Sequence, residues 1–574
     1  MSKKNYKFVN ERTKVILPGY MASANAFMDK INFVEIINKS VDWDPKQWKV
    51  SPGILLKAVI LNTFTNARSP LYQIGQAFKD IDTEHLFGKG ITPDMFTDSA
   101  IGAALERVYA ANAGKIFQTL SLTVFKKYEL PINRLHSDTT SISFYGDYEE
   151  NQNTETDQKD QNNQKLNINY GHSKDYRPNC KQMKIGQITN EAGIMVSCNT
   201  LDGNTSDVTW NKEALKLIKE LQKKFKMFDN AIYVADCKLM TKKLFLKMTD
   251  DEDGVLFLSR VPASFDSKLE SRIREKAYNE KNWDNIGKIK DTKKACKYKI
   301  QEFTEDVYGV STPTRLVVVK SSASLASFKA SLRKNKSKLE KAIKELNKEV
   351  FACKKDAEKE LKAFRKKYKK APYIFSIDLN KIETEKRPPG NPGKNPKPPK
   401  IIVEWSLNIK IDKVDRKAYR LLRQKAESFV LISNVPKEMA TSKNLLEEYK
   451  GQIVVELNFK VMKSPALTST VFLKKEERIE AMMMLIGVSL MIRALILYKL
   501  RKGFKESGKH PKIGYSGTAL KTVTMGLFEY AMDSLTIEKQ KDGEYHVHIM
   551  DKKQKQRALT LLEYLDLEIS DLLQ

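Results

Sequence analysis

The feature that most constrains the fold is a run of short β-branched or apolar segments, two of which carry an aspartate or end at one. Residues 134–146 (RLHSDTTSISFYG) are rich in β-branched and aromatic residues, which is typical of a strand. Residues 184–198 predict two strands around a turn, and 231–235 and 254–259 predict two more. A helix is expected from about 211 to 225. Strands mixed with helices predict an α/β or α+β core.

The first 126 residues predict helices. Ser51-Pro52 indicates a helix start, because proline suits the first helical position. This helix is expected to reach Phe64, a second short helix to cover 71–78, and a third to begin near Thr97. Helix, short break and helix is compatible with a helix-turn-helix DNA reader. A plain helical bundle fits the same pattern equally well.

Residues from about 263 to 425 look inserted, with strand-like stretches at 315–320 and 401–411 and a charged helix expected over 323–370. Apolar residues recur in that helix at heptad spacing, in the series Leu325, Leu332, Leu339, Leu346 and Cys353 and in the series Ile343, Val350, Ala357 and Phe364. A self-associating coiled coil and a long helix folded on its own domain explain this spacing equally well. Residues 386–400 (KRPPGNPGKNPKPPK) predict an extended linker.

Helices are expected to dominate again after a strand at 428–433. One helix is predicted over about 443–462. The longest apolar run, 481–492, is shorter than the unbroken span of about 20 residues that crosses a bilayer, so it predicts a buried core helix rather than a membrane segment. The last helix, 557–573, has a leucine stripe suited to docking or dimerisation.

The charge balance indicates a polyanionic partner. The chain has 100 Lys and Arg against 71 Asp and Glu, a formal net charge of +29, and a pI near 9.5. This excess favours nucleic acid over an anionic membrane surface, and over a lysine-rich composition without function. None of the five cysteines forms a C-x-x-C pair, so neither a disulfide framework nor a zinc site is indicated, and a reducing cytosol fits. The first ten residues are polar, and no signal peptide is expected.

Two aspartates stand where an α/β sheet commonly carries chemistry. Asp138 lies inside its strand, against the β propensity of aspartate. Asp236 directly follows the apolar strand 231–235, at the end where open α/β sheets hold their sites, although a strand-terminal aspartate is also a common helix N-cap. Phosphodiester cleavage with two metal ions needs such a cluster of acidic oxygens, and Mg²⁺ prefers carboxylate ligands.

Glu456 is the third candidate acid. If 443–462 is helical, Tyr449, Gln452, Glu456 and Lys463 follow one another at i, i+3, i+7 and i+14 and share one narrow stripe. That stripe would present an aromatic ring, an amide, a carboxylate and an ammonium group to one site. A solvated helix face has the same spacing, so the pattern alone does not decide between the two.

In these contexts the three acids resemble the catalytic triad of insertion-sequence DDE transposases, specifically the insertion-sequence-four group. The signature of this group is Tyr-x2-Arg-x3-Glu-x6-Lys. Tyr449, Glu456 and Lys463 match it, and Gln452 stands where the group has arginine. Further tracts that resemble the group are DTTSIS at 138–143, SKDYRPNCKQ at 173–182 and DGNTSD at 202–207. The resemblance covers about residues 130 to 500.

The resemblance implies an α/β fold with an RNase H-like catalytic core that an insertion domain interrupts and helical regions flank. The expected domains are a helical DNA-binding domain at 1–126, the first part of the core at 127–262, the insertion domain at 263–425, the second part of the core with the catalytic glutamate at 426–500, and a helical dimerisation region at 501–574.

The resemblance also implies roles for individual residues. Asp138, Asp236 and Glu456 would be the catalytic acids and would hold two Mg²⁺ ions, for which Mn²⁺ can substitute. The expected DNA contacts are Tyr449, Gln452, Lys463, Lys174, Arg177 and Lys181. Gln452 can donate a hydrogen bond where arginine would add charge, which weakens the expected phosphate contact. A surface basic cluster is the alternative for the last three, and His136 and His172 are expected to be structural.

The function implied is that of a transposase, which cuts DNA at the ends of a mobile element and joins them to target DNA. The implied partners are double-stranded DNA, as terminal inverted repeats and as target, and a second copy of the chain in the synaptic complex. No membrane partner is expected, and the implied location is the bacterial cytoplasm, at the nucleoid when DNA is bound. The alternatives are a catalytically inactive transposase-derived DNA-binding protein, against which the three retained acids argue, and an RNase H-like nuclease without strand transfer.

Overall fold

The computed structural model describes residues 15–573 except 66–68, 146–147, 149–164, 251–253, 267, 290–294, 388–389, 391–397, 465–472, 509–511, 513–517, 520–521, 540–544 and 550–551. Residues 149–168 are polar and rich in Asn, Gln and Asp, which predicts a loop; most of them, and most of the linker at 386–400, lie outside the described residues. The chain divides into two compact units. The first, here called the core unit, comprises 1–239, 243–257 and 448–574; the second, the insertion unit, comprises 240–242 and 258–447.

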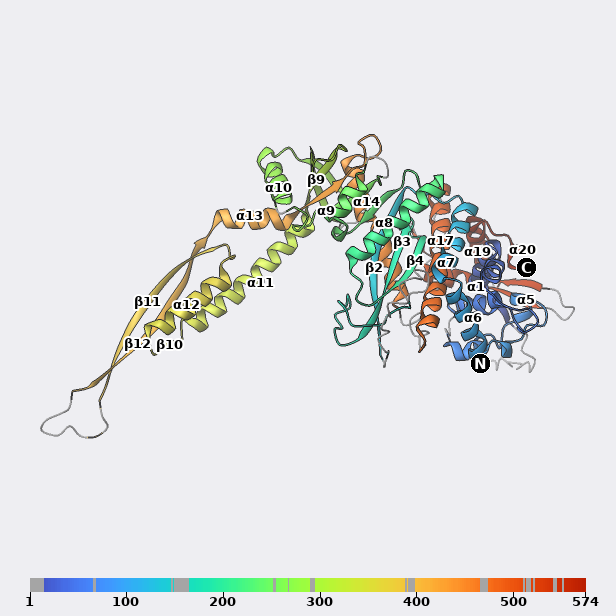
Figure 1. The fold of residues 1–574 in the computed structure, drawn as a ribbon, viewed down its shortest axis with the longest axis horizontal. Helices are drawn as coiled ribbons and strands as arrows, with labels where there is room; N and C mark the ends of the chain where they lie inside the picture. The colour runs from blue at the N-terminus through green and yellow to red at the C-terminus, as the bar shows by residue number, and fades with distance from the viewer. Residues whose placement is uncertain are drawn as a thin grey trace, which may run out of the picture. The chain divides into compact units, whose positions relative to one another are not determined.

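The core unit contains four strands in the order β4-β3-β2-β5. Strand β2 (Arg134–Phe144) pairs antiparallel with β3 (Lys181–Asn190) and parallel with β5 (Ile232–Ala235), and β4 (Met195–Leu201) lies outside β3 (Figure 1). The strands expected around 134–146, 184–198 and 231–235 are therefore present. Their β-branched residues are largely buried, which makes this mixed sheet the framework for the residues described below.

Helix α8 (Asp207–Lys224) packs on this sheet through Trp210, which is fully buried. Gly186 of β3 makes room for the indole, because a Cβ at that position would lie 2.6 Å from the ring. The indole Nε1 donates a hydrogen bond to Ser137 Oγ at 2.9 Å, which fixes the start of the helix against the middle of β2. The helix begins four residues earlier than expected, because the Ser206 hydroxyl caps it by accepting from Thr209 N at 3.1 Å.

Helices form the rest of the core unit, together with a small sheet of β1 (Val15–Pro18), β14 (Leu535–Lys539) and β15 (Tyr545–Ile549). The N-terminal helices are α1 (Gly19–Lys30), α2 (Phe33–Ser40), α3 (Pro52–Asn62), α4 (Ile74–Ala77), α5 (Thr83–Phe87), α6 (Asp98–Ala110) and α7 (Ala113–Lys127). The C-terminal helices are α17 (Glu476–Ser507), α18 (Met525–Met532), α19 (Lys552–Leu565) and α20 (Ile569–Leu572). As expected, Ser51 caps α3 and Pro52 is its first residue.

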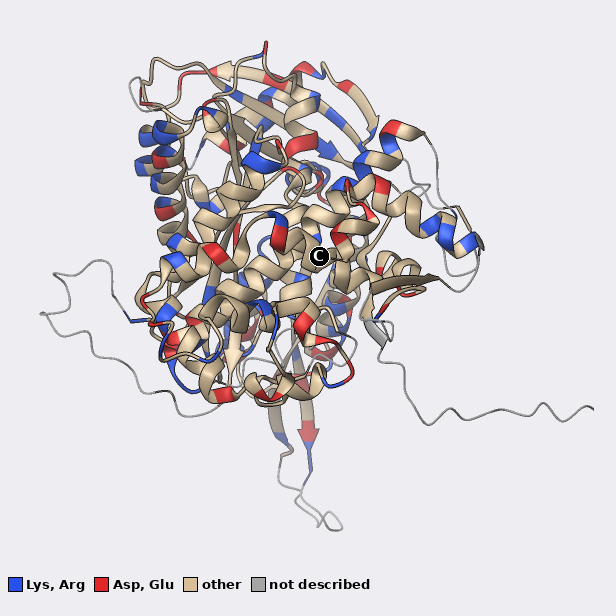
Figure 2. Cartoon of the chain, turned by 90° about the vertical axis from the view of Figure 1, so that its right-hand side faces the viewer, with Lys and Arg blue, Asp and Glu red and all other residues tan. Residues whose placement is uncertain are grey.

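The long helix α17 runs through the centre of these helices and contacts α3, α6, α7 and α19. It is long and apolar enough to cross a membrane by length and composition, but 83% of its most apolar stretch is buried inside the protein. The burial agrees with the core helix predicted from residues 481–492. Figure 2, which colours the backbone by residue type, shows acidic and basic residues interspersed along the chain.

The prediction of a single C-terminal helix over 557–573 is wrong. The structure has two helices, because Asp566 adopts a left-handed conformation (φ 53°) and Glu568 caps a new helix, α20. The leucine stripe of α19, which includes Leu561, Leu562 and Leu565, is buried against the core unit itself. Its docking surface therefore lies within the same chain.

The insertion unit has a sheet of five strands in the order β6-β13-β9-β8-β7. These strands are β6 (Phe257–Arg260), β13 (Ser428–Ser433), β9 (Thr314–Ser321), β8 (Lys297–Glu305) and β7 (Asp284–Lys288). The neighbours β6-β13, β13-β9, β9-β8 and β8-β7 are antiparallel. Helix α10 (Leu269–Glu280) packs against β9 and β13.

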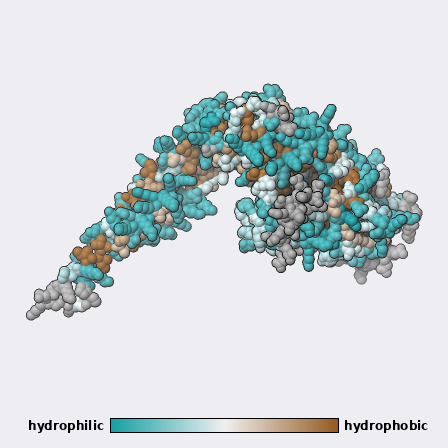
Figure 3. Space-filling model, viewed as in Figure 1, coloured by the Kyte–Doolittle hydropathy of each residue, from teal (hydrophilic) through white to brown (hydrophobic). Residues whose placement is uncertain are grey.

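Residues 322–427 form a projection of the insertion unit that we call the stalk. Its hairpin joins β11 (Tyr373–Lys386) and β12 (Lys400–Val414), with α11 (Ser322–Leu346) and α12 (Lys354–Tyr368) lying along it and α13 (Arg416–Glu427) following it (Figure 1). A small core holds these elements together, made of Leu339, Ile343, Phe364, Leu407 and Ile409. Apolar patches interrupt an otherwise hydrophilic surface (Figure 3).

The prediction of a continuous helix over 323–370 is also wrong. The helix ends at Leu346, where the Asn347 side chain bonds to the backbone of Ile409, accepting from its N–H at 2.8 Å and donating to its carbonyl at 2.9 Å. The short strand β10 (Val350–Phe351) then pairs with β12 before α12 begins. Buried heptad residues such as Leu339 and Phe364 pack on the hairpin, which favours the helix folded on its own domain over the coiled coil.

Candidate active site

The sheet of the core unit brings Asp138 and Asp236 together. Strands β2 and β5 run parallel, and Ser137 lies opposite Ala235 in their register. Asp138 and Asp236 each follow that pair by one residue, so their side chains point to the same face of the sheet. The Asp138 charge helps to raise the pKa of Asp236, which shows that the two carboxylates share one neighbourhood. The aspartates predicted from the strand pattern therefore lie side by side.

A third aspartate, Asp207, joins this pair. It is the first residue of α8, and its Oδ1 accepts a hydrogen bond from the Thr139 hydroxyl of β2 at 2.7 Å. In the sequence, Asp207 stands out only as the last residue of the DGNTSD tract. Its position next to a serine N-cap gave no reason to place it beside Asp138, because an acid in the first turn of a helix usually only stabilises the helix dipole.

The ammonium group of Lys174 lies among these acids. Its Nζ is 3.2 Å from Asp138 Oδ1 and 3.4 Å from Asp207 Oδ1, and it donates a hydrogen bond to the Thr139 carbonyl at 2.7 Å. Lys174, Asp138 and Asp207 are partly exposed, at 29%, 26% and 26%. The acids are thus open to solvent and share one internal cation.

The electrostatics of the three acids differ. Burial raises the pKa of Asp236, and the charges of Asp138 and Asp207 add to this effect; the backbone N–H of Lys238 at 2.9 Å opposes it. Burial also acts to raise the pKa of Asp207, but the hydrogen bond from Thr139 and the nearby ammonium of Lys174 lower it overall. A cation at this site would therefore oppose both the burial of the Asp236 charge and its repulsion by Asp138 and Asp207.

Glu456 lies on a short helix beside the same strand. Helix α15 (Ile453–Met462) packs against β2 and β3, and Asn458 Nδ2 donates to the Gly193 carbonyl at 2.9 Å. Gln452 Nε2 lies 3.4 Å from the carbonyl oxygen of Ser137, the residue before Asp138. Glu456 is one helical turn further on and exposed. The structure therefore places the signature segment beside Asp138, without a contact between Glu456 and the aspartates.

The sequence predicts that the four signature residues follow one uninterrupted helix, and this prediction is wrong. The segment divides into α14 (Ser442–Gly451) and α15, with Gln452 between them and Lys463 at the C-terminal end of α15. Gly451 faces the buried His136 ring: a Cβ on it would lie 3.4 Å from Cε1. Burial, aided by the charge of Arg134, lowers the pKa of His136 to about 4, so the ring is neutral at pH 7.

The basic residues expected to contact DNA lie on a loop and at its edge. Arg177 Nη1 donates to the Tyr145 hydroxyl at 2.7 Å, and Lys181 donates to the carbonyl of Tyr148. Lys463 Nζ lies 2.7 and 2.8 Å from the two carboxylate oxygens of Asp175, on the same loop as Lys174. The structure thus gathers Lys174, Lys463 and the aspartates into one site, with intramolecular partners for both lysines.

The donor set of this site suits a hard divalent cation. Within the described part of the chain, no three His, Cys, Asp or Glu side chains are already grouped to hold a metal. However, Asp138 and Asp207 already direct carboxylate oxygens at one cation, the Lys174 ammonium. Mg²⁺ typically binds through one or two carboxylates and keeps several waters. Asp138, Asp207 and Asp236 can therefore hold such an ion once Lys174 leaves.

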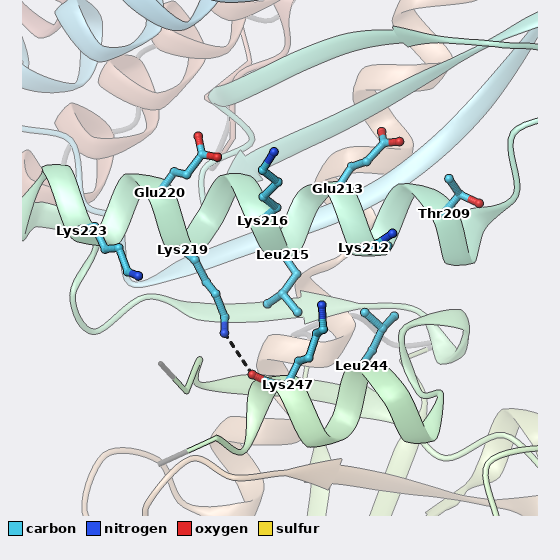
Figure 4. A pocket seen from close by; sticks show the side chains of 10 residues that line it. All are labelled: Thr209, Lys212, Glu213, Leu215, Lys216, Lys219, Glu220, Lys223, Leu244 and Lys247. Carbon is cyan, nitrogen blue, oxygen red and sulfur yellow. Dashed lines mark hydrogen bonds between the residues drawn. The ribbon is translucent and has the colours of Figure 1, made fainter. Parts of the chain in front are cut away.

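A separate groove lies between α8 and α9 (Lys242–Met248), with a volume of about 470 Å³ (Figure 4). Leu215 and Leu244 contribute its apolar surface, and Lys219 Nζ donates to the Lys247 carbonyl at 3.1 Å. Five lysines line it with two glutamates, and none of the three aspartates does. Without clustered acids it offers no metal chemistry, so the reactive site is the carboxylate cluster on the sheet.

Asp138 on one strand and Asp236 directly after the parallel neighbouring strand, with a further acid and lysines around them, define a candidate for the class of metal-dependent enzymes that act on phosphodiesters. The model of the family described as "Transposase DDE domain" matches residues 138–492. The chain therefore belongs to the DDE transposases, of the insertion-sequence type. A domain of unknown function, DUF4277, matches residues 19–122, the helices α1 to α7. A search of curated proteins found no match.

Proposed function

We propose that this chain is an active transposase that cuts DNA at the ends of its element and joins them to target DNA. The observation that carries the proposal is the position of Asp138 on β2 and of Asp236 directly after the adjacent parallel strand β5, inside the region that matches the DDE domain. We further propose that the sheet and α8 form an RNase H-like core, into which residues 263–425 are inserted as a separate domain.

In the proposed reaction, water attacks the phosphorus at the element end and the bond to the 3′ oxygen breaks, which leaves a 3′-hydroxyl. That hydroxyl then attacks a second phosphate in line, either in target DNA or first on the opposite strand as a hairpin. When bound, a pair of divalent ions would stabilise the charge that develops on the phosphate and activate the attacking oxygen. Mg²⁺ is the ion we propose, with Mn²⁺ as a substitute.

The residues of the chain bind and orient these groups. Asp138 and Asp236 would hold the metal from the sheet, and Glu456 would complete the site from α15 when DNA is bound. Lys463, Tyr449 and Gln452 would contact phosphates of the cleaved end, with Lys174, Arg177 and Lys181 as further contacts. Released protons can pass to bulk water, so the neutral, buried His136 has no proposed role as a base.

Recognition and assembly are proposed from the helical regions. The helices α1 to α7 would read the terminal inverted repeats, and pairing of two ends would need two copies of the chain. We place the reaction in the bacterial cytoplasm, on nucleoid DNA. The net charge of +29 supports a polyanionic partner.

The test is an in vitro reaction with Mg²⁺, the purified chain and a DNA that carries both element ends. The proposal expects excised element and joined products, detected by sequencing the new junctions. Cleavage without junctions would favour a nuclease without strand transfer. Binding of the ends without cleavage would favour a transposase-derived DNA-binding protein.

A further inference from the structure

The loop that follows Gly171 carries two consecutive charged residues with different partners. The Lys174 ammonium donates hydrogen bonds to the Thr139 carbonyl (2.7 Å) and to Asp138 (3.2 Å) and forms an ion pair with Asp207 (3.4 Å). Asp175, the next residue, pairs through both carboxylate oxygens with Lys463 at the end of α15. One loop therefore neutralises both the acids and a basic residue of the site.

The position of Asp207 indicates more than a favourable charge at a helix start. Its Oδ1 accepts from Thr139 and lies 3.4 Å from the Lys174 ammonium, so the carboxylate turns toward β2. Trp210, bonded to Ser137 at 2.9 Å, fixes this end of α8 against the strand. Asp207 is thereby held beside Asp138 by contacts that involve no metal.

We propose that Lys174 is an internal counter-ion for Asp138 and Asp207, and that an entering divalent cation displaces it. Asp207 then faces the metal together with Asp138 and Asp236, as a further carboxylate of the site. This inference rests on the proposed function. The ammonium keeps its proton throughout and moves to solvent or to a DNA phosphate, so no bond is made or broken.

The same movement acts on Lys463. Lys174 and Asp175 lie in one turn, in which the Tyr176 N–H donates to the Ser173 carbonyl at 3.3 Å, and Tyr176 has a positive φ of 57°. Because the turn ties the two residues together, displacement of Lys174 withdraws Asp175 from Lys463. Lys463 is then available for a DNA phosphate. Metal binding and DNA binding thus strengthen each other, and by linkage the effect is equal in both directions.

The first experiment measures Mn²⁺ binding to the full-length protein without DNA, from the electron paramagnetic resonance signal of free Mn²⁺. Lys174→Met should tighten binding roughly two- to fivefold, the scale of a partly exposed ion pair. Lys174→Arg, which keeps the charge, should bind like the wild type. Lys216→Met, on the exposed face of α8, is the matched control and should change nothing. Asp207→Asn should weaken binding.

The second experiment measures binding of a short mixed-sequence DNA duplex by fluorescence anisotropy, with and without Mn²⁺. Asp175→Asn should tighten DNA binding without metal and reduce the gain that Mn²⁺ produces in the wild type. Thermal unfolding identifies variants that fail to fold; Lys174→Gln then replaces Lys174→Met, with the same expected direction.

The outcomes separate this inference from the proposed function. If Asp138→Asn abolishes Mn²⁺ binding while Lys174→Met and Asp207→Asn both bind like the wild type, the metal site stands and the counter-ion role of Lys174 is wrong. If Asp175→Asn leaves the Mn²⁺-dependent gain in DNA affinity unchanged, the link to Lys463 is wrong. If Asp138→Asn itself binds Mn²⁺ normally, the proposed metal chemistry fails as well.

Discussion

The core unit and the stalk carry their charge in different ways. In the core unit, Asp138 and Asp207 are held within 3.4 Å of one ammonium by strand register and a helix cap. The stalk, residues 322–427, has 30 Lys and Arg among its 106 residues, whereas the other 468 residues of the chain have 70. The density of Asp and Glu is the same in both parts, with 13 in the stalk and 58 in the rest of the chain. A lysine-rich composition would raise the density of basic residues throughout the chain, so it does not explain their concentration in the stalk.

This difference indicates that the chemistry of the core unit depends on the exact positions of a few side chains, whereas that of the stalk depends on its total charge. Among the described cations of the stalk, few have an acidic partner; Lys336–Glu340 and Lys354–Glu358 are examples of such pairs. Lys355, Lys359, Lys362 and Lys366 lie on one exposed face of α12. Single substitutions should therefore have large effects at the carboxylate cluster and small effects in the stalk.

The largest expected effect comes from the aspartates on the sheet. Asp138→Asn or Asp236→Asn should lower the rate of DNA cleavage by about a thousandfold or more, because each removes a carboxylate that holds the metal. Binding of the element end should remain, as measured by gel shift. Asp229→Asn, an exposed aspartate just before β5, is the control and should cleave normally. Normal cleavage by either of the first two variants would refute their assignment.

Glu456→Gln sharpens the comparison inside the core unit. Glu456 is exposed and outside the cluster of Asp138, Asp207 and Asp236, so we expect it to act only when DNA is bound. Cleavage should fall about as far as in Asp138→Asn, while Mn²⁺ binding without DNA should change far less. Equal loss of Mn²⁺ binding in both variants would show that Glu456 belongs to the site from the start.

A matched pair of quadruple variants tests the stalk. Replacing Lys355, Lys359, Lys362 and Lys366 by Gln should flatten the dependence of log affinity on log salt, by about one unit for each DNA phosphate that the variant no longer neutralises. The control replaces the four lysines with the same spacing on α8, which are Lys212, Lys216, Lys219 and Lys223. A smaller change in the control is expected. Equal changes would mean that the stalk charge has no special role.

The prediction with the smallest expected effect on activity concerns the stability of the folded protein rather than the cleavage or binding of DNA. Burial raises the pKa of Glu480 on α17 to about 7, with Asp202 and Glu477 adding to it, while a hydrogen bond with Thr200 opposes it. Since the folded state keeps this proton and the unfolded chain loses it near pH 4.5, stability should fall as pH rises from about 4.5 to 7 and then level off.

Glu480→Gln should remove this fall, and should raise stability above pH 7 by on the order of 3 kcal/mol. Thermal unfolding at several pH values measures both. Glu506→Gln, exposed on the same helix, should leave the pH dependence as it is in the wild type. A pH profile in Glu480→Gln that matches the wild type would contradict the assigned burial effect.

Local patterns predicted much of the fold. The β-branched segments that became β2, β5 and β13 and the start of α3 at Ser51-Pro52 follow from residue preference alone. Asp138 then became a candidate because it lies inside a strand, and Asp236 because it directly follows one. The breaks in helices were missed because distant residues cause them. Asn347 bonds to Ile409, and Gly451 lies against His136. Helical periodicity contains no information about either contact.

Asp207 shows the same limit within the site. Its sequence context, after a serine cap, describes a helix start, and only the Trp210–Ser137 bond brings that start to β2. The role of Lys174 likewise depends on a loop that folds back over the strand. The domain boundaries stay predictions, and so do the DNA-contacting residues, which need bound DNA to be tested.

The central claim is that Asp138, Asp236 and Glu456 converge on a pair of divalent ions beside a DNA phosphate. Iron-directed cleavage tests it most directly: Fe²⁺ replaces Mg²⁺ in the complex with element-end DNA, ascorbate and peroxide generate radicals at the metal, and mass spectrometry maps the cuts in the protein backbone. We predict cuts near residues 138, 236 and 456, all of which disappear in Asp138→Asn. Cuts confined to other segments, or cuts near 138 and 236 without any near 456, would contradict the account.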